Sequence, residues 1–490
     1  PLDINGDGTP DAPTYADNRC FSDPGAPKPV WPNPTSGDSE KIDDLFHAAV
    51  NGRGLFFSAS NPEELVNSLV QVIVGISNDQ ASGASVAING LEGGTAEQLF
   101  QSSYMSNWTG DLKAFAVDRK TGTAITGEGN EQWTASDVLQ GMDWDIHRKI
   151  ATSDGNAGVV FSTAGLSASL KGKIHADLAT ADDIIEFVRG KAVPGYRTRE
   201  KTLGDLIHSA PVYYDGTVFV GGNDGMLHAF NATNGYERFG FIPNQVLENL
   251  HELIDVNYEH KYFVDASPTV TDINGTILLV SGLAKGGKGY FALDVTNASS
   301  YHGDESDNDA ESTLASMFKW QFPQSSDADV GYSYSHTTVA KSNGGTYAVV
   351  FGNGYNSANG HAILYVLNAL DGSVIAKIDT GVGSSANPNG LSSPVVIDVD
   401  DDFRFDFAYA GDLRGNLWKF DLSDPSPANW GVAFADSSNV PQPLFESQRS
   451  ITTQPDVTYH CEEFGYLVVF GTGQYLGDPD VSNTDVQTVY

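Results

Sequence analysis

The sequence predicts a mainly β fold: a β-propeller of about seven blades with helical insertions, preceded by a small α/β segment. Three observations lead to this prediction. Glycine, serine and threonine become frequent after about residue 80, where the apolar runs are short and rich in β-branched residues. A pattern of glycine, strand, aromatic residue and Asx or Gly turn recurs five times in that part. A single sheet cannot bury both of its faces alone, so several sheets are expected to stack radially.

The first 80 residues differ from the rest in pattern. Residues 12–41 are rich in Pro, Gly, Ser and Asp, which predicts a loop. Apolar residues recur at helical spacing over residues 41–50 and 65–76, which predicts two helices. The short apolar run Leu55–Ala59 lies between them and is typical of a buried strand. Residues 1–80 are therefore predicted to be an appended α/β remnant.

The repeat defines the predicted propeller, residues 81–490. Each copy predicts a strand that ends near an aromatic residue, then a turn, then a further strand. The copies span Trp108–Gly122, Gly222–Gly235, Gly286–Asn297, Gly360–Gly372 and Gly411–Leu422. Most intervals, of about 50–75 residues, suit four-stranded blades with insertions. A generic β-sandwich with recurrent Asp-Gly hairpins is the alternative, which the fixed order of the repeat disfavours.

Residues 130–200 interrupt the repeat, and we expect a helical insertion there. Thr180–Gly190 has the apolar spacing of an amphipathic helix, and Thr180 is suited to cap its N-terminus. The histidines of the chain form no HExxH or HxH motif. His208, His228 and His251 are therefore expected to be strand or loop residues rather than metal ligands.

The most specific chemical signal is the nine-residue segment Asp398–Asp406. It has aspartates at loop positions 1, 3, 5 and 9, and position 7 can offer a backbone carbonyl. In that order these residues are Asp398, Asp400, Asp402, Asp406 and Arg404. Ca²⁺ binds about six to eight hard oxygens, and a tight turn with Asp at alternate positions directs several to one point. Apolar β segments flank the loop, and its carboxylates repel one another without a cation. An acidic surface turn that binds nothing is the alternative.

A second loop of the same type opens the chain. Its predicted calcium ligands are Asp3, Asn5, Asp7, Asp11 and the carbonyl of Thr9. Position 6 of this loop is Gly8, which suits a sharp turn, whereas Phe403 holds that position in the other loop. Neither loop has Glu at position 12, so neither is an EF-hand.

Composition limits the classes of partner. The chain of 490 residues has 27 Lys plus Arg against 63 Asp plus Glu, a formal charge of −36. Nucleic acid and anionic membrane surfaces repel such a protein, so neither is an expected partner. Apolar runs are too short for a transmembrane helix, so no membrane insertion is expected. Two cysteines, Cys20 and Cys461, exclude a disulfide framework and leave one long-range disulfide open.

Several segments together resemble one known family. They are Ile42–Gly54, Leu203–Tyr213, Val218–Phe230, Phe263–Val270, Ala348–Ser357, Gly390–Leu422 and Phe470–Leu476. On these residues the chain resembles the PilC/PilY-type tip adhesins and assembly factors of type IV pili. Ile42–Gly54 is similar to the end of the family's von Willebrand A-like domain. The resemblance therefore implies that residues 1–80 are the C-terminal part of that domain, with a calcium loop, and that 81–490 are the propeller.

The resemblance also implies a function. Family members act at the bacterial cell surface, at the pilus tip, after export through the periplasm and outer membrane. They support pilus (fimbrium) assembly, twitching motility and cell adhesion, with minor pilins and host or abiotic surfaces as partners. Calcium in the propeller loop regulates extension and retraction, and its ligands map onto Asp398–Asp406. Phe403 replaces the family's usual glycine, and no Arg-Gly-Asp sequence occurs, so integrin binding is not expected.

Two other functions are open as alternatives. A quinoprotein dehydrogenase-like propeller enzyme shares the aromatic, Asp and Thr-Gly pattern of the blades. Such enzymes usually place a vicinal cysteine pair against the quinone, and the two cysteines of this chain are isolated. No GxSxG or P-loop motif occurs either, so we predict that the protein is not an enzyme. A purely structural surface propeller would differ from a pilus adhesin only in its partner.

Overall fold

The computed structural model describes residues 82–88, 98–105, 107–118, 124–126, 129–303, 311–460 and 465–490. The α/β segment, the N-terminal calcium loop and both cysteines lie outside these ranges. Contacts divide the chain into a small unit and a large one, which comprises Asp79–Asp456 and Val469–Tyr490. The structure describes one strand pair in the small unit, β26 (Asp456–Tyr459) with β27 (Tyr466–Val469). The first residue of β26 and the last residue of β27 belong to the large unit.

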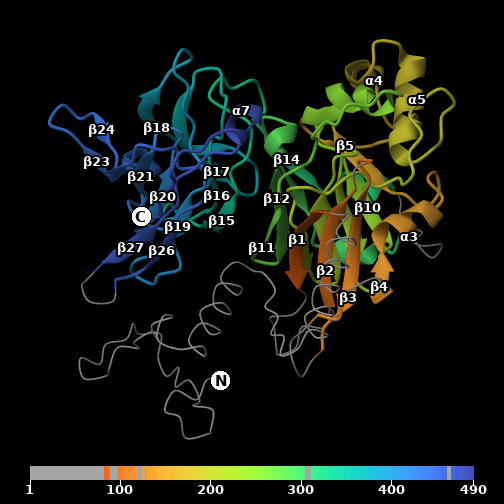
Figure 1. The fold of residues 1–490 in the computed structure, drawn as a ribbon, viewed down its shortest axis with the longest axis horizontal. Helices are drawn as coiled ribbons and strands as arrows, with labels where there is room; N and C mark the ends of the chain where they lie inside the picture. Colours follow the sequence, from red (N-terminus) through yellow and green to blue (C-terminus); the bar gives the residue numbers. More distant parts are fainter. Residues whose placement is uncertain are drawn as a thin grey trace, which may run out of the picture. The chain divides into compact units, whose positions relative to one another are not determined.

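The large unit is mainly β, as predicted, and is built from successive sheets (Figure 1). The described residues form five sheets of four or more strands, whose sequential strands pair in antiparallel fashion. The first sheet has β1 (Ser82–Ile88), β2 (Gln98–Tyr104), β3 (Gly110–Ala116) and β4 (Glu131–Thr134). The second contains β7 (Val212–Tyr214), β8 (Thr217–Gly221), β9 (Leu227–Asn231) and β10 (Glu237–Phe241). The third has β11 (Thr269–Ile273), β12 (Thr276–Gly282), β13 (Tyr290–Asp294) and β14 (Phe318–Phe322).

The fourth and fifth sheets continue the same order. The fourth has β15 (Thr338–Lys341), β16 (Tyr347–Gly352), β17 (His361–Asn368) and β18 (Val374–Gly383). The fifth has β19 (Val395–Ile397), β20 (Phe407–Gly411), β21 (Asn416–Asp421), β22 (Gly431–Val432) and β25 (Phe445–Glu446). A separate pair is formed by β23 (Phe434–Ala435) and β24 (Pro441–Gln442). The number of about seven blades stays a prediction.

A glycine at the end of a strand marks where one sheet packs on the next segment of chain in four of the sheets. The strands β8, β12, β16 and β20 are largely buried and end at Gly221, Gly282, Gly352 and Gly411. A Cβ on Gly221 would lie 2.2 Å from the carbonyl oxygen of Val264, and one on Gly352 2.2 Å from that of Ser392. Only glycine therefore permits this close approach.

The turn of the repeat serves a similar purpose. Trp133 of β4 donates from Nε1 to the carbonyl of Ala232 at 2.9 Å, and Trp320 of β14 donates to that of Ala369 at 2.8 Å. The turn glycines that follow, Gly235 and Gly372, have φ of 74° and 70° and lie against these indole rings. Each tryptophan thus joins the last strand of one sheet to the turn of the following sheet.

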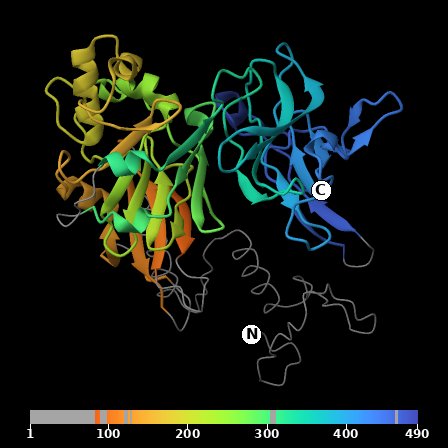
Figure 2. The same ribbon diagram turned by 180° about the vertical axis from the view of Figure 1, so that it is seen from behind.

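The segment predicted as a helical insertion contains strands as well as helices. It has α3 (Ala135–Gly141), α4 (Ala168–Ile174), α5 (Leu178–Arg189), β5 (Ile150–Ser153) and β6 (Gly158–Val160). Strand β5 pairs in parallel with β10, and β6 pairs with β5, so the second sheet has six strands. Both views show α4 and α5 together at one end of this sheet (Figures 1 and 2).

The cap predicted for α5 was wrong. The helix begins at Leu178, and the side chain of Asp177 accepts a hydrogen bond from the backbone N–H of Ala179 at 3.1 Å. Aspartate ranks above threonine as an N-cap, and Thr180 instead donates its hydroxyl to Asp177 at 3.0 Å. The helix ends at Gly190, whose φ of 127° suits glycine.

The remaining helical elements are short. They are α6 (Glu311–Ala315), α7 (Asp478–Val481), η1 (Asn244–Ile254), η2 (Ala284–Gly286), η3 (Ala298–Ser300) and η4 (Pro427–Asn429). The 3₁₀ segment η1 packs against both α4 and α5. None of the helices in the described ranges is long and apolar enough to cross a membrane.

Candidate functional site

The acidic loop Asp398–Asp406 connects β19 to β20. Ile397 pairs with Phe407 in the antiparallel register, so the nine residues between them form the whole connection. Both flanking segments are strands, as the sequence predicted. The loop is therefore anchored at both ends by one ladder of backbone hydrogen bonds.

Three of the predicted ligands lie together. Asp398, Asp400 and Asp406 each offer a carboxylate oxygen, and these oxygens all lie within 4.8 Å of one another. Asp406 is buried, Asp398 is half-buried and Asp400 is exposed. The group therefore opens to solvent on the side of Asp400 and rests on the protein at Asp406.

Asp406 is held in place by the preceding sheet. Its Oδ1 accepts a hydrogen bond from Nδ2 of Asn343 at 2.9 Å, and its Oδ2 accepts one from the N–H of Val399 at 2.9 Å. Asn343 follows β15 and also donates to the carbonyl of Phe405 at 3.0 Å. No local pattern in the sequence predicted this contact, because Asn343 lies 63 residues before Asp406.

The loop backbone is wound tightly around Asp398. Oδ2 of Asp398 accepts a hydrogen bond from the N–H of Phe403 at 2.7 Å, and Oδ1 accepts one from Asp400 at 3.3 Å. Asp401 and Phe403 have φ of 61° and 66°. Phe403 thus takes the left-handed conformation that glycine favours, and its ring is 89% exposed. That conformation costs an L-residue about 1–2 kcal/mol.

Asp402 and Arg404 lie in the same loop but outside the group of three. Oδ1 of Asp402 accepts a hydrogen bond from the backbone N–H of Arg404 at 2.9 Å, and Oδ2 lies 3.3 Å from Nε of that arginine. Nη1 of Arg404 donates to the carbonyl of Ser342 at 3.2 Å. Asp402 would have to leave this ion pair to join a bound cation.

The electrostatics of the loop favour a cation. The loop has five aspartates but one arginine. Loss of hydration and then the negative charges of Asp402 and Asp406 raise the pKa of Asp400 above its ordinary value. The clustered oxygens are hard, anionic donors that open to solvent, and such a donor set fits Ca²⁺. The second predicted group, Asp3, Asn5, Asp7, Thr9 and Asp11, lies outside the described residues.

A second cluster of charges lies buried in the second sheet. Arg148 pairs with Glu237 through Nε at 2.6 Å and through Nη2 at 2.8 Å. Nδ1 of His228 lies 2.7 Å from Glu237, and its Nε2 lies 3.0 Å from Asp224. Two cations face two carboxylates here, so the cluster is neutral within itself.

The four partners set one another's protonation. Burial lowers the pKa of His228, but Asp224 and Glu237 outweigh it and raise that pKa to about 9. Burial raises the pKa of Glu237, but Arg148 and His228 outweigh it and lower that pKa to about 2. His228 is therefore a charged strand residue, which agrees with its predicted place in a strand.

Comparisons with known proteins find matches to one family. Residues 207–490 match the model of the PilY1 beta-propeller domain. The chain is 34% identical to a type IV pilus biogenesis factor PilY1 of Pseudomonas aeruginosa PAO1, over 94% of this chain and 44% of that protein. It is 30% identical to a PilY1 homolog of Xylella fastidiosa Temecula1, over 90% of this chain and 35% of that protein. The chain thus spans less than half the length of these relatives.

A solved structure is also similar. It is the crystal structure of the C-terminal domain of Pseudomonas aeruginosa PilY1, at 35% identity and a TM-score of 0.45. The match covers 56% of this chain and 56% of the other.

Proposed function

This chain belongs to the family of the PilY1 β-propeller domain, and from that membership we propose that it works in type IV pilus biogenesis as a calcium-binding tip adhesin. The relatives that it matches are named type IV pilus biogenesis factors. The proposal has three parts: calcium binding by the propeller loop, regulation of pilus extension and retraction, and surface attachment. It includes no enzymatic activity, and it places the protein outside the cell at the pilus tip, with minor pilins as partners.

The observation that carries the calcium part is the gathering of three carboxylates between β19 and β20. Asp398, Asp400 and Asp406 would hold the ion. Asp402 and the carbonyl of Arg404 would complete the oxygen set once the ion pair between these two residues opens. Bound calcium supplies positive charge that offsets the repulsion between the carboxylates and so stiffens the loop.

The regulatory part is tested with Asp400→Asn in the gene of the protein that contains this chain. The substitution keeps the size of the side chain and removes one anionic ligand. We expect altered pilus numbers and altered twitching, while the propeller remains folded. Normal pili and twitching, with calcium binding lost, would reject the regulatory role and keep the site.

The partner part is tested by capture of minor pilins on the immobilised wild-type protein. Capture supports a place at the pilus tip, and its absence would favour a structural surface propeller. The N-terminal loop stays a prediction with its own test. Calorimetry that finds one calcium per chain, unchanged by Asp7→Ala, would reject that second site.

A further inference from the structure

A groove next to the first two sheets has the lining of a ligand site. It has a volume of about 610 Å³, and its lining includes Asn107, Trp108, Arg197, Thr198, Asn257 and Tyr258. It adjoins a smaller cavity of about 20 Å³, with which it shares Trp108, Arg197 and Tyr258. The groove is distant in sequence from the acidic loop and uses none of its residues.

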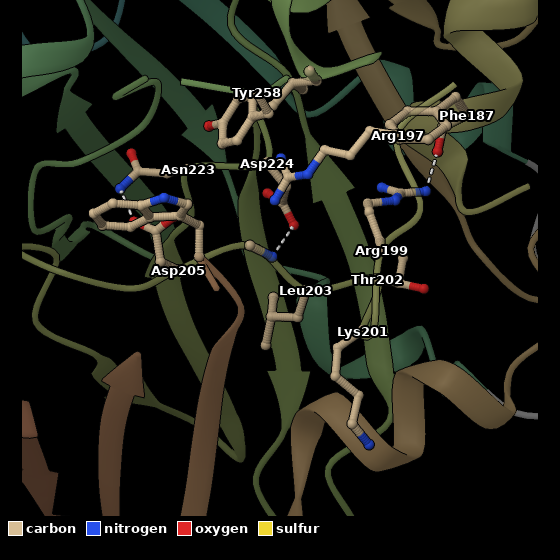
Figure 3. Close-up of a pocket in the computed structure, with 13 residues that line it drawn as sticks. Phe187, Arg197, Arg199, Lys201, Thr202, Leu203, Asp205, Asn223, Asp224 and Tyr258 are labelled. Atoms are coloured by element: carbon tan, nitrogen blue, oxygen red, sulfur yellow. Dashed lines mark hydrogen bonds between the residues drawn. The ribbon is translucent and has the colours of Figure 1, made fainter. Parts of the chain in front are cut away.

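Two arginines at this place lack the carboxylate partners that others have. Arg148 pairs with Glu237, and Arg189 pairs with Glu311. Arg197 and Arg199 form no ion pair with a carboxylate of the described residues, although the chain has 63 acidic residues. Figure 3 shows both side chains, with Arg199 directed at the carbonyl of Phe187. Arg199 is thus engaged by that carbonyl and by the Phe187 ring, whose centre lies 3.9 Å from its guanidinium carbon, so Arg197 is the guanidinium left to attract an anion from outside.

The geometry of Arg197 also suits a carboxylate ligand. Its guanidinium lies 3.8 Å from the centre of the Tyr258 ring, so the ring supports one face of the planar group. The N–H groups at the edge of a stacked guanidinium are left to donate in a fork. A carboxylate can therefore receive two parallel hydrogen bonds from it.

Trp108 is held in the groove at a cost to its backbone. Its φ is 62°, which is unusual for a bulky residue. Its indole ring stacks on the imidazole of His260, with 4.1 Å between the ring centres. Asn107 fixes the turn by accepting hydrogen bonds from both the N–H and the hydroxyl of Thr109. Strain of this kind is typical of functional sites.

The carboxylates nearby are already engaged. Asp224 accepts hydrogen bonds from the N–H of Gly204 and contacts His228. Asp205 accepts one from Asn223 at 2.7 Å and lies 2.9 Å from Nε2 of His260. Both line the small cavity, and the described lining of the large groove has no acidic side chain. Glu200 borders the groove and accepts a hydrogen bond from Nδ2 of Asn107 at 2.7 Å, so Arg197 is the charged side chain of the lining itself that an anionic ligand would meet.

We propose that this groove binds a carboxylated saccharide. The C–H face of a sugar ring packs on an aromatic side chain such as Trp108, and its hydroxyl groups suit amide and hydroxyl partners such as Asn257 and Thr198. The carboxylate pairs with Arg197. The volume lies within the range of about 300–1,000 Å³ that is typical of small-ligand sites, whereas a stable protein partner requires a much broader surface.

The test is calorimetry on the whole chain with sialyllactose and trigalacturonate as acidic probes. Lactose is the neutral control for sialyllactose, and triglutamate tests whether the groove prefers an acidic peptide. We expect both acidic sugars to bind and lactose to bind at least about tenfold more weakly. Arg197→Gln should remove most of this difference, and Trp108→Ala should weaken all the sugars. Arg449→Gln, which removes an exposed arginine paired with Asp485, should change nothing.

Three results would overturn the proposal. One is no binding of either acidic sugar to the wild type. Another is equal binding of the acidic sugars by wild type and Arg197→Gln. This comparison still tests the proposal if Trp108→Ala does not fold. The third is tighter binding of triglutamate than of both acidic sugars, which would assign the groove to acidic peptides.

Discussion

The acidic loop and the buried charge cluster both gather carboxylates, but they balance them in different ways. In the cluster, Arg148 and His228 face Glu237 and Asp224 inside the second sheet. In the loop, three carboxylates share one point, and the arginine of the loop pairs with a fourth. The first region carries its own cations, so its charge stabilises the fold. For the second region we propose that Ca²⁺ from solution supplies the balancing charge, so its charge is available for function.

The largest expected effect comes from breaking the buried pair. Arg148→Met removes the cation and leaves Glu237 buried with His228 as its remaining charged partner. Loss of one partner of a buried ion pair typically costs about 3–5 kcal/mol. We expect that loss in the free energy of unfolding, measured with urea. Arg449→Gln at an exposed pair is the control, with an expected loss of about 0–1 kcal/mol. Equal losses in Arg148→Met and Arg449→Gln would show that the buried pair stabilises the fold no more than the exposed pair does.

Calcium should stabilise the loop region and leave the cluster unaffected. A ligand present at about 100 times its Kd stabilises the folded state by about 2.7 kcal/mol. We expect a gain of this size in the wild type, measured by urea unfolding with calcium against EDTA. Arg148→Met should show the same gain, since its defect is elsewhere. If the gain from calcium disappeared in Arg148→Met but persisted in Asp400→Asn, calcium would act on the buried cluster and not on the acidic loop.

The cluster should be sensitive to pH in a defined direction. The pKa of His228 is raised from its ordinary 6.5 to about 9, so the protonated form stabilises the fold. This contribution is fully present below pH 6.5 and is lost as the pH rises through about 9. The effect is smaller than that of Arg148→Met, because neutral histidine still keeps one hydrogen bond. Unfolding measured from pH 6 to pH 10 should show the decline, and His228→Gln should flatten it.

The smallest expected effect concerns Phe403. Phe403→Gly relieves the left-handed backbone that the loop adopts at position 6, so the free energy of unfolding, measured with urea, should rise by about 1 kcal/mol. Phe403→Ala is the matched control, because it removes the exposed ring and keeps the Cβ that causes the strain. Equal stabilities of the two variants would show that the backbone of Phe403 is not strained.

Local patterns in the sequence predicted the sheets and the strands beside the acidic loop, although they missed Asp177 as the cap of α5. The repeat predicted a mainly β propeller, and some glycines of its copies are points of close approach between segments, such as Gly286 against Phe263. The strands on either side of Asp398–Asp406 were predicted because their apolar residues lie next to the loop. The different position of Asp402 was not predictable, because spacing alone cannot show that Arg404 pairs with it.

Contacts between residues that are far apart in the chain could not be predicted from the sequence. Asn343 supports Asp406 across 63 residues, and Arg148 meets Glu237 across 89. The parallel pairing of β5 with β10 joins an inserted segment, which the repeat does not include, to the sheet that contains the copy Gly222–Gly235. Each of these contacts depends on how the sheets stack, and no local pattern encodes that arrangement.

The most direct test of the central claim is a calcium titration of the 490-residue chain by calorimetry. Wild type is compared with Asp400→Asn, and Asp436→Asn serves as an exposed acidic control outside the loop. We predict that Asp400→Asn weakens one equivalent of calcium binding at least about tenfold, or about 1.4 kcal/mol, while Asp436→Asn matches the wild type. Identical titrations of wild type and Asp400→Asn would contradict the account.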